Sequence, residues 1–169
     1  MKWQRNDMII EGPIEDYLIS LFDEQLERGI KLKVSIGTDS QKVTKSTYKF
    51  ATVILITMSE DLGGDITVGR GGMIIHKTFF NTFKNSNREL VNERMVYEVG
   101  KSIEVAYEIA PLLDLYEIKL EVHADINPDP KHDSNKALQQ AVGYILGMGY
   151  DFKIKPSAPA ASNIADKLC

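Results

Sequence analysis

Two acidic residues follow alternating stretches of the chain, and their placement suggests a metal site. In residues 33–41, Lys-Val-Ser-Ile-Gly-Thr-Asp-Ser-Gln, an apolar face alternates with a small, polar face that ends in Asp39. Residues 116–124 alternate in the same way and are followed by Asp125. If the two stretches are neighbouring parallel strands, roughly 4.8 Å apart, both carboxylates can contact one metal ion. The alternative for Asp39 is structural, because Asp-Ser after a strand commonly opens a turn.

A long helix predicted over residues 88–110 offers a third acid. Its apolar face is defined by Val91, Met95, Ala106, Ile109 and the later Leu113. Glu98 and Ser102 fall within this face, where a glutamate is costly unless it is paired or holds a metal. The alternative to a metal ligand is a buried salt bridge between Glu98 and Lys49 or Arg70.

The end of the chain offers a fourth acid. Pro159 is expected to open a short helix that runs to Leu168, with Ala161, Ala165 and Leu168 on its apolar side. Asp166 lies at the margin of that side, four residues after Ser162. It is either part of the same site or a solvated acid near the chain end.

The chemistry of these candidates favours a hard cation. Carboxylates without a cysteine cluster suit Mg²⁺ or Mn²⁺. The three histidines, His76, His123 and His132, lack the spacing of a zinc site, and we expect His123 to be a surface residue. The sequence contains no phosphate-binding loop, dinucleotide fingerprint or nucleophile elbow, which argues against nucleotide-binding and serine-hydrolase functions.

The elements that must position these acids follow a recognisable order. A helix from Pro13 to Gly29 precedes three strands, of which residues 50–56 read as a strand buried on both faces. Gly69, Gly71 and Gly72 in the third strand suggest a bulge. Then come a helix, a strand, a second helix within residues 133–146, a short strand over residues 151–155 and the final helix. This order predicts a five-stranded mixed α/β sheet, an antiparallel meander plus two parallel strands, flanked by helices.

Composition sets the broad class of the protein. The chain has 169 residues, 43% of them hydrophobic and 26% charged, and no linker-like segment, so we expect one domain over residues 1–169 with residues 1–30 as a helical extension. One cysteine, no signal-like segment and no membrane span suggest a cytoplasmic protein. The net charge of −4 argues against a general electrostatic grip on nucleic acid. Acids at a site would therefore need metal before a polyanion approaches.

The motifs resemble a known family. They are Ile36-Gly-Thr-Asp-Ser-Gln41, Glu98-Val-x-x-Ser102, His123-x-Asp125-x-Asn127-Pro128, Ser134-Asn-Lys136, the glycine-rich stretch from Gly143 to Tyr150, Lys155-Pro156, and Ala160-Ala-Ser-x-x-Ala-Asp166. Together they are similar to the YkuK-type family of predicted ribonuclease H-like proteins, from about residue 30 onward. The resemblance implies the ribonuclease H-like fold and cleavage of nucleic acid, DNA or RNA, with two metal ions.

Carried over by position, the resemblance makes Asp39, Glu98 and Asp125 the core ligands and Asp166 a variable fourth. Asn87-Arg88-Glu89-Leu90 looks like the start of the acidic helix of ribonuclease H and would nominate Glu89 instead. We prefer Glu98 because Glu89 lies off the apolar face. The chain lacks the basic insertion that grips an RNA–DNA hybrid, which puts that substrate in doubt.

Two functions remain open. The first is a metal-dependent nuclease that hydrolyses phosphodiester bonds, in which Asp39 bridges two Mg²⁺ or Mn²⁺ ions, Glu98 and Asp125 complete one site and Asp166 the other. Phosphates would then meet Lys42, Lys45 or Lys155, and the cleaved strand would contact Ser40 and Gln41. The second is a non-catalytic module that binds nucleic acid or a protein, which the negative net charge favours. The sequence leaves the oligomeric state open.

Overall fold

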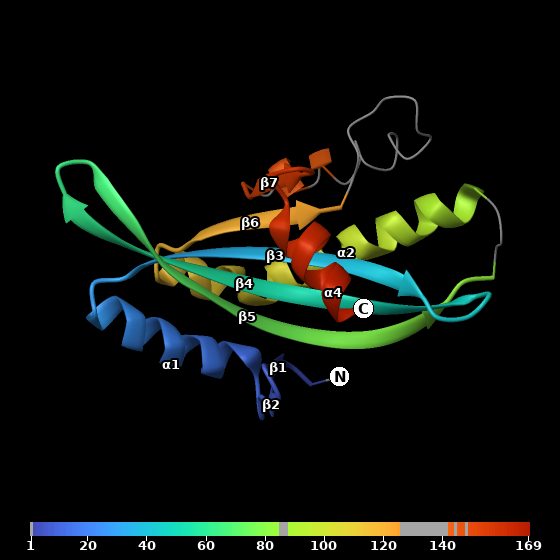
Figure 1. Cartoon of the computed structure of the whole chain (residues 1–169), viewed down its shortest axis with the longest axis horizontal. Coiled ribbons are helices and arrows are strands. Elements are labelled where there is room, and N and C mark those ends of the chain that lie inside the picture. Colours follow the sequence, from blue (N-terminus) through green and yellow to red (C-terminus); the bar gives the residue numbers. More distant parts are fainter. Residues whose placement is uncertain (1, 85–87, 126–141, 144, 148) are drawn as a thin grey trace.

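The computed structural model describes residues 2–84, 88–125, 142–143, 145–147 and 149–169. For residues 88–90 and 92 it describes the backbone but not the side chains. Its centre is one mixed sheet of seven strands in the order β2-β1-β5-β4-β3-β6-β7 (Figure 1). In the described part of the chain, no helix is both long and apolar enough to cross a membrane.

The middle of the sheet is the predicted antiparallel meander. It consists of β3 (Lys31–Lys42), β4 (Thr47–Gly63) and β5 (Ile66–Thr82). Residues 50–56 of β4 are buried on both faces, as their continuous run of apolar and β-branched side chains predicts. The β4–β5 register shifts between the pairs Thr57–Gly72 and Ser59–Gly69, which confirms the bulge expected at these glycines.

Two parallel strands extend the meander on the β3 side, also as predicted. β6 (Lys119–Ala124) pairs with β3, and β7 (Asp151–Ile154) pairs with β6. The long helix α2 (Arg88–Leu115) connects β5 to β6 and packs against β3 and β6. The helix expected within residues 133–146 and the cap expected at residues 85–87 fall largely or wholly outside the described residues.

The predicted strand count of five is wrong, because a small hairpin adds two strands at the β5 edge. β1 (Gln4–Arg5) and β2 (Met8–Ile9) pair with each other, and Gln4 of β1 pairs with His76 of β5. Strands of two residues are too short to show an alternating pattern. The N-terminal extension therefore contains a hairpin as well as the predicted helix, α1 (Ile14–Glu27).

The long helix also continues further than predicted. α2 passes through Pro111 and ends at Leu115 rather than at Ala110. Proline removes one intrahelical hydrogen bond, but the extra turn buries Leu113, which is 1% exposed. Burial of this side chain explains why the helix does not stop at the proline.

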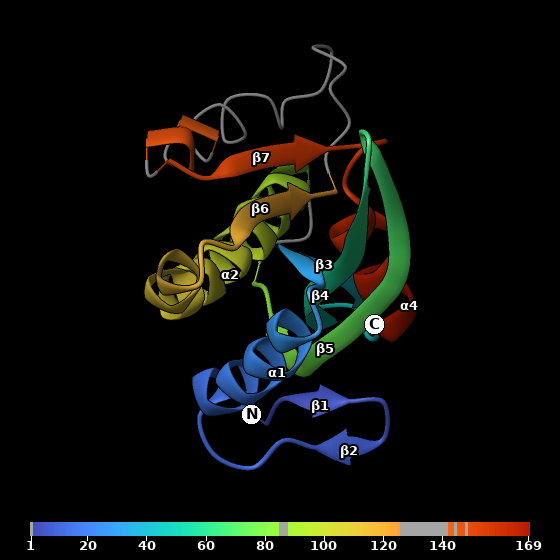
Figure 2. The ribbon, with the colours of Figure 1, turned by 90° about the vertical axis from the view of Figure 1, so that its left-hand side faces the viewer.

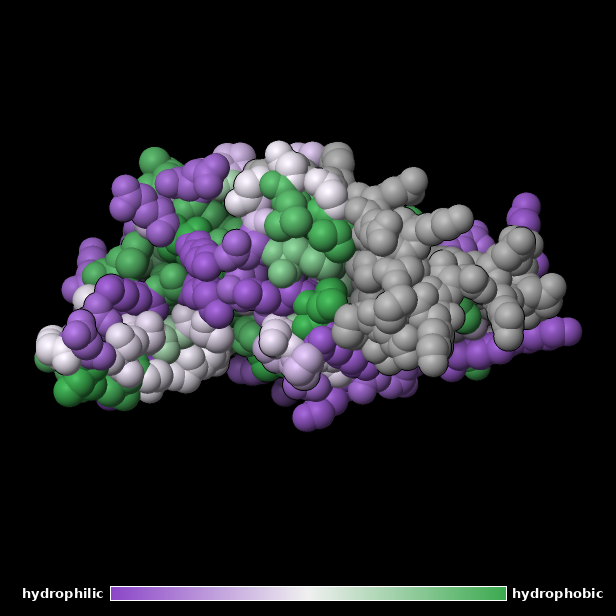
Figure 3. Space-filling model, turned by 90° about the horizontal axis from the view of Figure 1, so that it is seen from above, coloured by the Kyte–Doolittle hydropathy of each residue, from purple (hydrophilic) through white to green (hydrophobic). Residues whose placement is uncertain are grey.

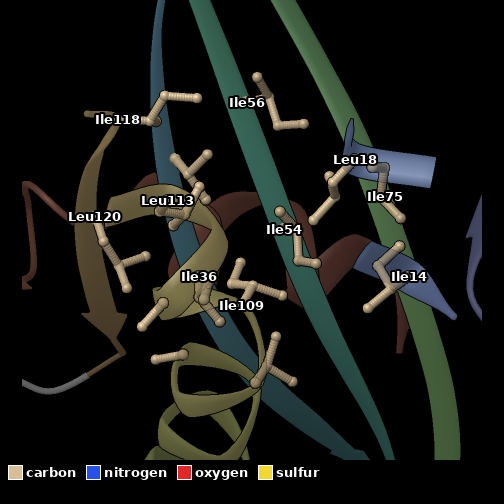
Figure 4. Packing of buried hydrophobic residues seen from close by; sticks show 14 of the residues in the cluster. Ile14, Leu18, Ile36, Ile54, Ile56, Ile75, Ile109, Leu113, Ile118 and Leu120 are labelled. Atoms are coloured by element: carbon tan, nitrogen blue, oxygen red, sulfur yellow. The ribbon is translucent and has the colours of Figure 1, made fainter. Parts of the chain in front are cut away.

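Helices cover the two faces of the sheet unequally. Figure 2 shows α1 and α2 on one face and the C-terminal segment, η1 (Ala160–Ala165) followed by α4 (Asp166–Leu168), on the other. The main core lies between the sheet and the first pair of helices, where the side chains shown in Figure 4 interdigitate: Ile14, Leu18, Ile36, Ile54, Ile56, Ile75, Ile109, Leu113, Ile118 and Leu120. Figure 3 shows the molecule from the β7 side, where hydrophilic residues separate the hydrophobic residues of the described surface into several patches.

Candidate metal centre

The two predicted strand acids lie beside each other in the sheet. Thr38 of β3 pairs with Ala124, the last residue of β6, so Asp39 and Asp125 each follow the final parallel pair. We had expected Asp39 to end its strand, and this expectation is wrong. β3 continues to Lys42 because its antiparallel pairing with β4 extends past Asp39, which is opposite Ala51.

Asp39 is a buried carboxylate in a negatively charged environment. Its side is covered by η1 and α4, and the residue is 8% exposed. Oδ1 accepts a hydrogen bond from the Ser40 backbone N–H at 2.8 Å. Burial, together with the nearby charges of Asp125 and Asp166, raises the pKa of Asp39 to about 6 despite this hydrogen bond.

Glu98 reaches the same region from α2, on the opposite face of β3. It is 6% exposed, and its Oε1 accepts a 2.6 Å hydrogen bond from the Ser40 hydroxyl. Burial, followed by the charges of Asp39 and Asp125, raises the pKa of Glu98 to about 8. Ser40 thus donates to both acids and joins them through one residue.

The predicted salt-bridge partners of Glu98 are wrong. Its cationic neighbour is Arg94, one helical turn earlier, with 3.5 Å between Arg94 Nε and Glu98 Oε1. Lys49 instead donates to the backbone oxygen of Leu168, and Arg70 pairs with Glu60. A helix places residues four positions apart on one side, so Arg94 is the partner that local geometry favours.

A row of hydroxyl groups fixes α2 against β3 beside the acids. Ser102 donates to Thr38 Oγ1 at 2.9 Å, and Thr38 Oγ1 is 2.9 Å from Thr52 Oγ1. All three residues are buried, so these hydrogen bonds satisfy groups that have no access to water. Ser40 is buried as well and bonded to Glu98, so the expected contact between Ser40 and a substrate strand does not fit this arrangement.

Asp125 and Asp166 lie toward the solvent side of the cluster. Asp125 Oδ1 is 2.6 Å from Lys155 Nζ, and this pairing raises the pKa of Lys155. Asp166 is exposed at the start of α4, where its Oδ1 accepts from Gln41 Nε2 at 3.2 Å. Gln41, unlike Ser40, is exposed, and it is hydrogen-bonded to Asp166.

The four acids gather in one region, but they do not form a ready metal cage. The charges of Asp125 and Asp166 raise the pKa of Asp39. The charges of Asp39 and Asp125 likewise raise the pKa of Glu98. Among the described residues, however, no three His, Cys, Asp or Glu side chains are arranged to hold one metal ion. The side chain of Glu89 lies outside the description. The donor set still suits a divalent cation: Asp39 and Glu98 are buried carboxylates with raised pKa values, and the cations paired with this group in the described residues are Arg94, beside Glu98, and Lys155, beside Asp125.

The segment η1, which directly precedes Asp166, lies on β3 at a glycine. A Cβ atom at Gly37 would be 2.4 Å from the Ala161 backbone N, which is closer than any ordinary contact. The glycine therefore allows η1 to approach the strand and keeps Asp166 near Asp39. No side chain larger than hydrogen fits at position 37 without moving this segment.

We expect Gly37→Ala to destabilise the protein by about 2 kcal/mol or more, because backbone must shift to admit the methyl group. Gly100→Ala is the matched control, since a Cβ there meets nothing within 4 Å and lies in α2. Alanine should stabilise that helix by up to about 1 kcal/mol. Thermal unfolding of both variants measures the difference, and equal stability of the two would contradict this account.

His123 is buried rather than on the surface, which corrects our expectation. It is 2% exposed, and its Nδ1 accepts a hydrogen bond from the Ala160 backbone N–H at 3.2 Å. Its Nε2 lies 3.2 Å from Glu121 Oε2, and Glu121 also pairs with Lys33. His123 therefore helps to attach the start of η1 to the sheet. The missed signal is its position two residues from Asp125 on the face that η1 covers.

Arg94 was also missed. Its guanidinium lies over the ring of Tyr48, with Cζ 5.4 Å from the ring centroid, and contacts the acid cluster through Glu98. The available signal was its spacing of four residues before Glu98.

The fold agrees with the family comparison. A family model described as Ribonuclease H-like matches residues 18–169, so the chain belongs to the ribonuclease H-like family. This match confirms the resemblance predicted from the motifs. No curated protein matches the chain.

Proposed function

We propose that this ribonuclease H-like protein is a nuclease that depends on Mg²⁺ or Mn²⁺ and hydrolyses phosphodiester bonds. The observation that carries the proposal is the pair of buried acids, Asp39 and Glu98, joined through Ser40 beside Asp125 and Asp166. Buried carboxylates with few cationic neighbours are unfavourable in a domain that has no use for them. The sequence resemblance assigns the metal ligands to these four acids, and the structure brings them into one region.

The donor set is made of oxygen atoms, which favours a hard divalent cation. Asp39, Glu98, Asp125 and Asp166 are the residues that would hold it. A bound cation of this kind activates water and stabilises the leaving oxygen. Because burial raises the pKa of Glu98 to about 8, this residue would have to lose a proton to hold a cation near neutral pH.

Two cationic side chains lie next to these acids and would contact a phosphate bound there. Lys155 now pairs with Asp125, and Arg94 pairs loosely with Glu98. With the carboxylates engaged as ligands, both side chains would be available for phosphate oxygens. Arg94 suits this role because its planar guanidinium matches phosphate geometry.

A non-catalytic module that binds nucleic acid or a protein is the second candidate. The observation that favours it is the 2.6 Å pair between Lys155 and Asp125, which neutralises one acid without metal. In such a protein the acids would serve the fold, and added metal would change nothing.

A cleavage panel separates the two candidates. Single-stranded, duplex, hybrid and branched DNA and RNA are incubated with the protein in Mn²⁺, in Mg²⁺ or in EDTA. The nuclease proposal expects cleavage of at least one substrate in metal and none in EDTA. Cleavage that persists in EDTA, or no cleavage of any substrate together with no binding of metal, would contradict it.

A further inference from the structure

We propose that an exposed sheet surface beside the acid cluster binds single-stranded nucleic acid and leads it to the cluster. The surface, called here the Phe80 surface, consists of Phe80 on β5, Lys49 on β4, and the lysines of the adjoining segments, Lys45 and Lys84. This inference deepens the proposed function and rests on its nucleic-acid substrate.

Phe80 is an aromatic side chain in an unusual position. It is 63% exposed, although its neighbour Phe79 is buried against Phe50 on the other face of the sheet. An exposed aromatic ring held on a sheet can act as a stacking platform for an unpaired base. Because Phe50, Phe79 and Phe83 pack together beneath it, β5 presents Phe80 from a firmly packed strand.

The strand register connects Phe80 to the acids. Gln41, Lys49 and Phe80 are consecutive partners across β3, β4 and β5, so they form one row on the same face. At one end of the row Gln41 donates to Asp166, and in the middle Lys49 donates to the Leu168 backbone oxygen. With strands roughly 4.8 Å apart, Phe80 lies roughly 10 Å from Gln41, about the span of two nucleotides.

The charges around the row suit a phosphate backbone. Lys45 and Lys84 are exposed and form no ion pair with any described residue. The Phe83 backbone N–H donates to Ser46, which places Lys84 beside the turn that carries Lys45. At the far end of the sheet, by contrast, cations are neutralised by the pairs Lys31–Asp61 and Arg70–Glu60. The net charge of −4 therefore conceals a local basic region next to the acids.

The chemistry of Phe80 selects single strands. A phenyl ring stacks on the flat face of an unpaired base, so removal of the ring weakens binding of single strands. Bases inside a duplex are already stacked on each other and cannot reach the ring. Stacking accepts any base, so we expect little sequence preference.

Fluorescence anisotropy tests the surface without depending on cleavage. The probes are labelled 12-nucleotide single strands of DNA and RNA and the matching duplexes, all in EDTA. We expect Phe80→Ala to weaken single-strand binding about tenfold, corresponding to about 1.4 kcal/mol, and to leave duplex binding unchanged. Phe80→Trp should retain the wild-type affinity. The matched control is Ile66→Ala, which removes another exposed apolar side chain, 57% exposed, at the other end of β5.

The outcomes distinguish this inference from the proposed function. Unchanged single-strand affinity in Phe80→Ala overturns the inference even if metal-dependent cleavage is found. Weakened binding without any metal-dependent cleavage upholds the surface and overturns the nuclease. If Phe80→Ala instead abolishes self-association in sedimentation and leaves nucleic-acid binding unaltered, the surface joins two copies of the chain and the inference is wrong.

Discussion

Replacing Asp39 with asparagine is expected to lower metal-dependent cleavage about a thousandfold or more. Asparagine keeps the shape of the side chain but removes the negative charge that a divalent ligand site needs. Asp39 lies close to two of the other acids, because the charges of Asp125 and Asp166 both contribute to its raised pKa. Loss of roughly 4 kcal/mol of transition-state stabilisation corresponds to a factor of about a thousand. The measurement is the initial rate on the best substrate of the cleavage panel.

Unfolding must be excluded as the cause of such a loss. Because Asp39 is buried with a raised pKa, Asp39→Asn should be at least as stable as the wild type in EDTA near pH 8. Asp65→Asn is the control variant, since Asp65 is an exposed residue in the β4–β5 turn, with a φ of 63° that asparagine also adopts. Cleavage by Asp39→Asn at the rate of Asp65→Asn would exclude Asp39 from the site.

The second large effect concerns stability. In EDTA, we expect Glu98→Gln to be more stable than the wild type by on the order of 4 kcal/mol at pH 8.5. Burial raises the pKa of Glu98 to about 8 in the folded state, well above the ordinary value of 4.5 in the unfolded chain. The folded protein therefore holds the proton more tightly. The stability that this provides is complete below about pH 4.5 and is lost as the pH rises toward 8.

Glutamine resembles the protonated acid, so the stability of Glu98→Gln does not fall in this way as the pH rises. Chemical denaturation of both proteins at pH 5 and pH 8.5 should give similar free energies of unfolding at the lower pH and a clear difference at the higher one. Glu104→Gln, on the exposed side of the same helix, controls for removal of a charge. A wild type that gains stability over Glu98→Gln between pH 5 and 8.5 would show that Glu98 is stabilised as an anion.

The fold was largely predictable because its main elements have long patterns. The alternation in residues 33–41 and 116–124 set the faces of β3 and β6, and the connecting helices made the two strands parallel. The small hairpin of β1 and β2 lacks such a pattern. Its local signal was the Asn6-Asp7 turn, in which Asn6 has a φ of 53°.

The acids could be nominated from the sequence, but their partners could not. Helix phase placed Glu98 on the buried side of α2, and the structure agrees. Its bond to Ser40 and the pair between Lys155 and Asp125 join residues that are far apart in the chain. Such contacts depend on how β3, α2 and the segment after β7 pack in three dimensions, which periodicity does not encode. His123 was misjudged for the same reason, because η1 covers its face.

The central claim is that these acids form a metal centre, and binding of Mn²⁺ tests it most directly. Calorimetric titration at pH 8 is carried out on the wild type, Asp125→Asn and the control Asp65→Asn. We expect the wild type and the control to bind Mn²⁺ with the same affinity and to release a proton from Glu98 on binding. We expect Asp125→Asn to bind Mn²⁺ at least tenfold more weakly. No binding to the wild type, or equal binding by Asp125→Asn, would contradict it.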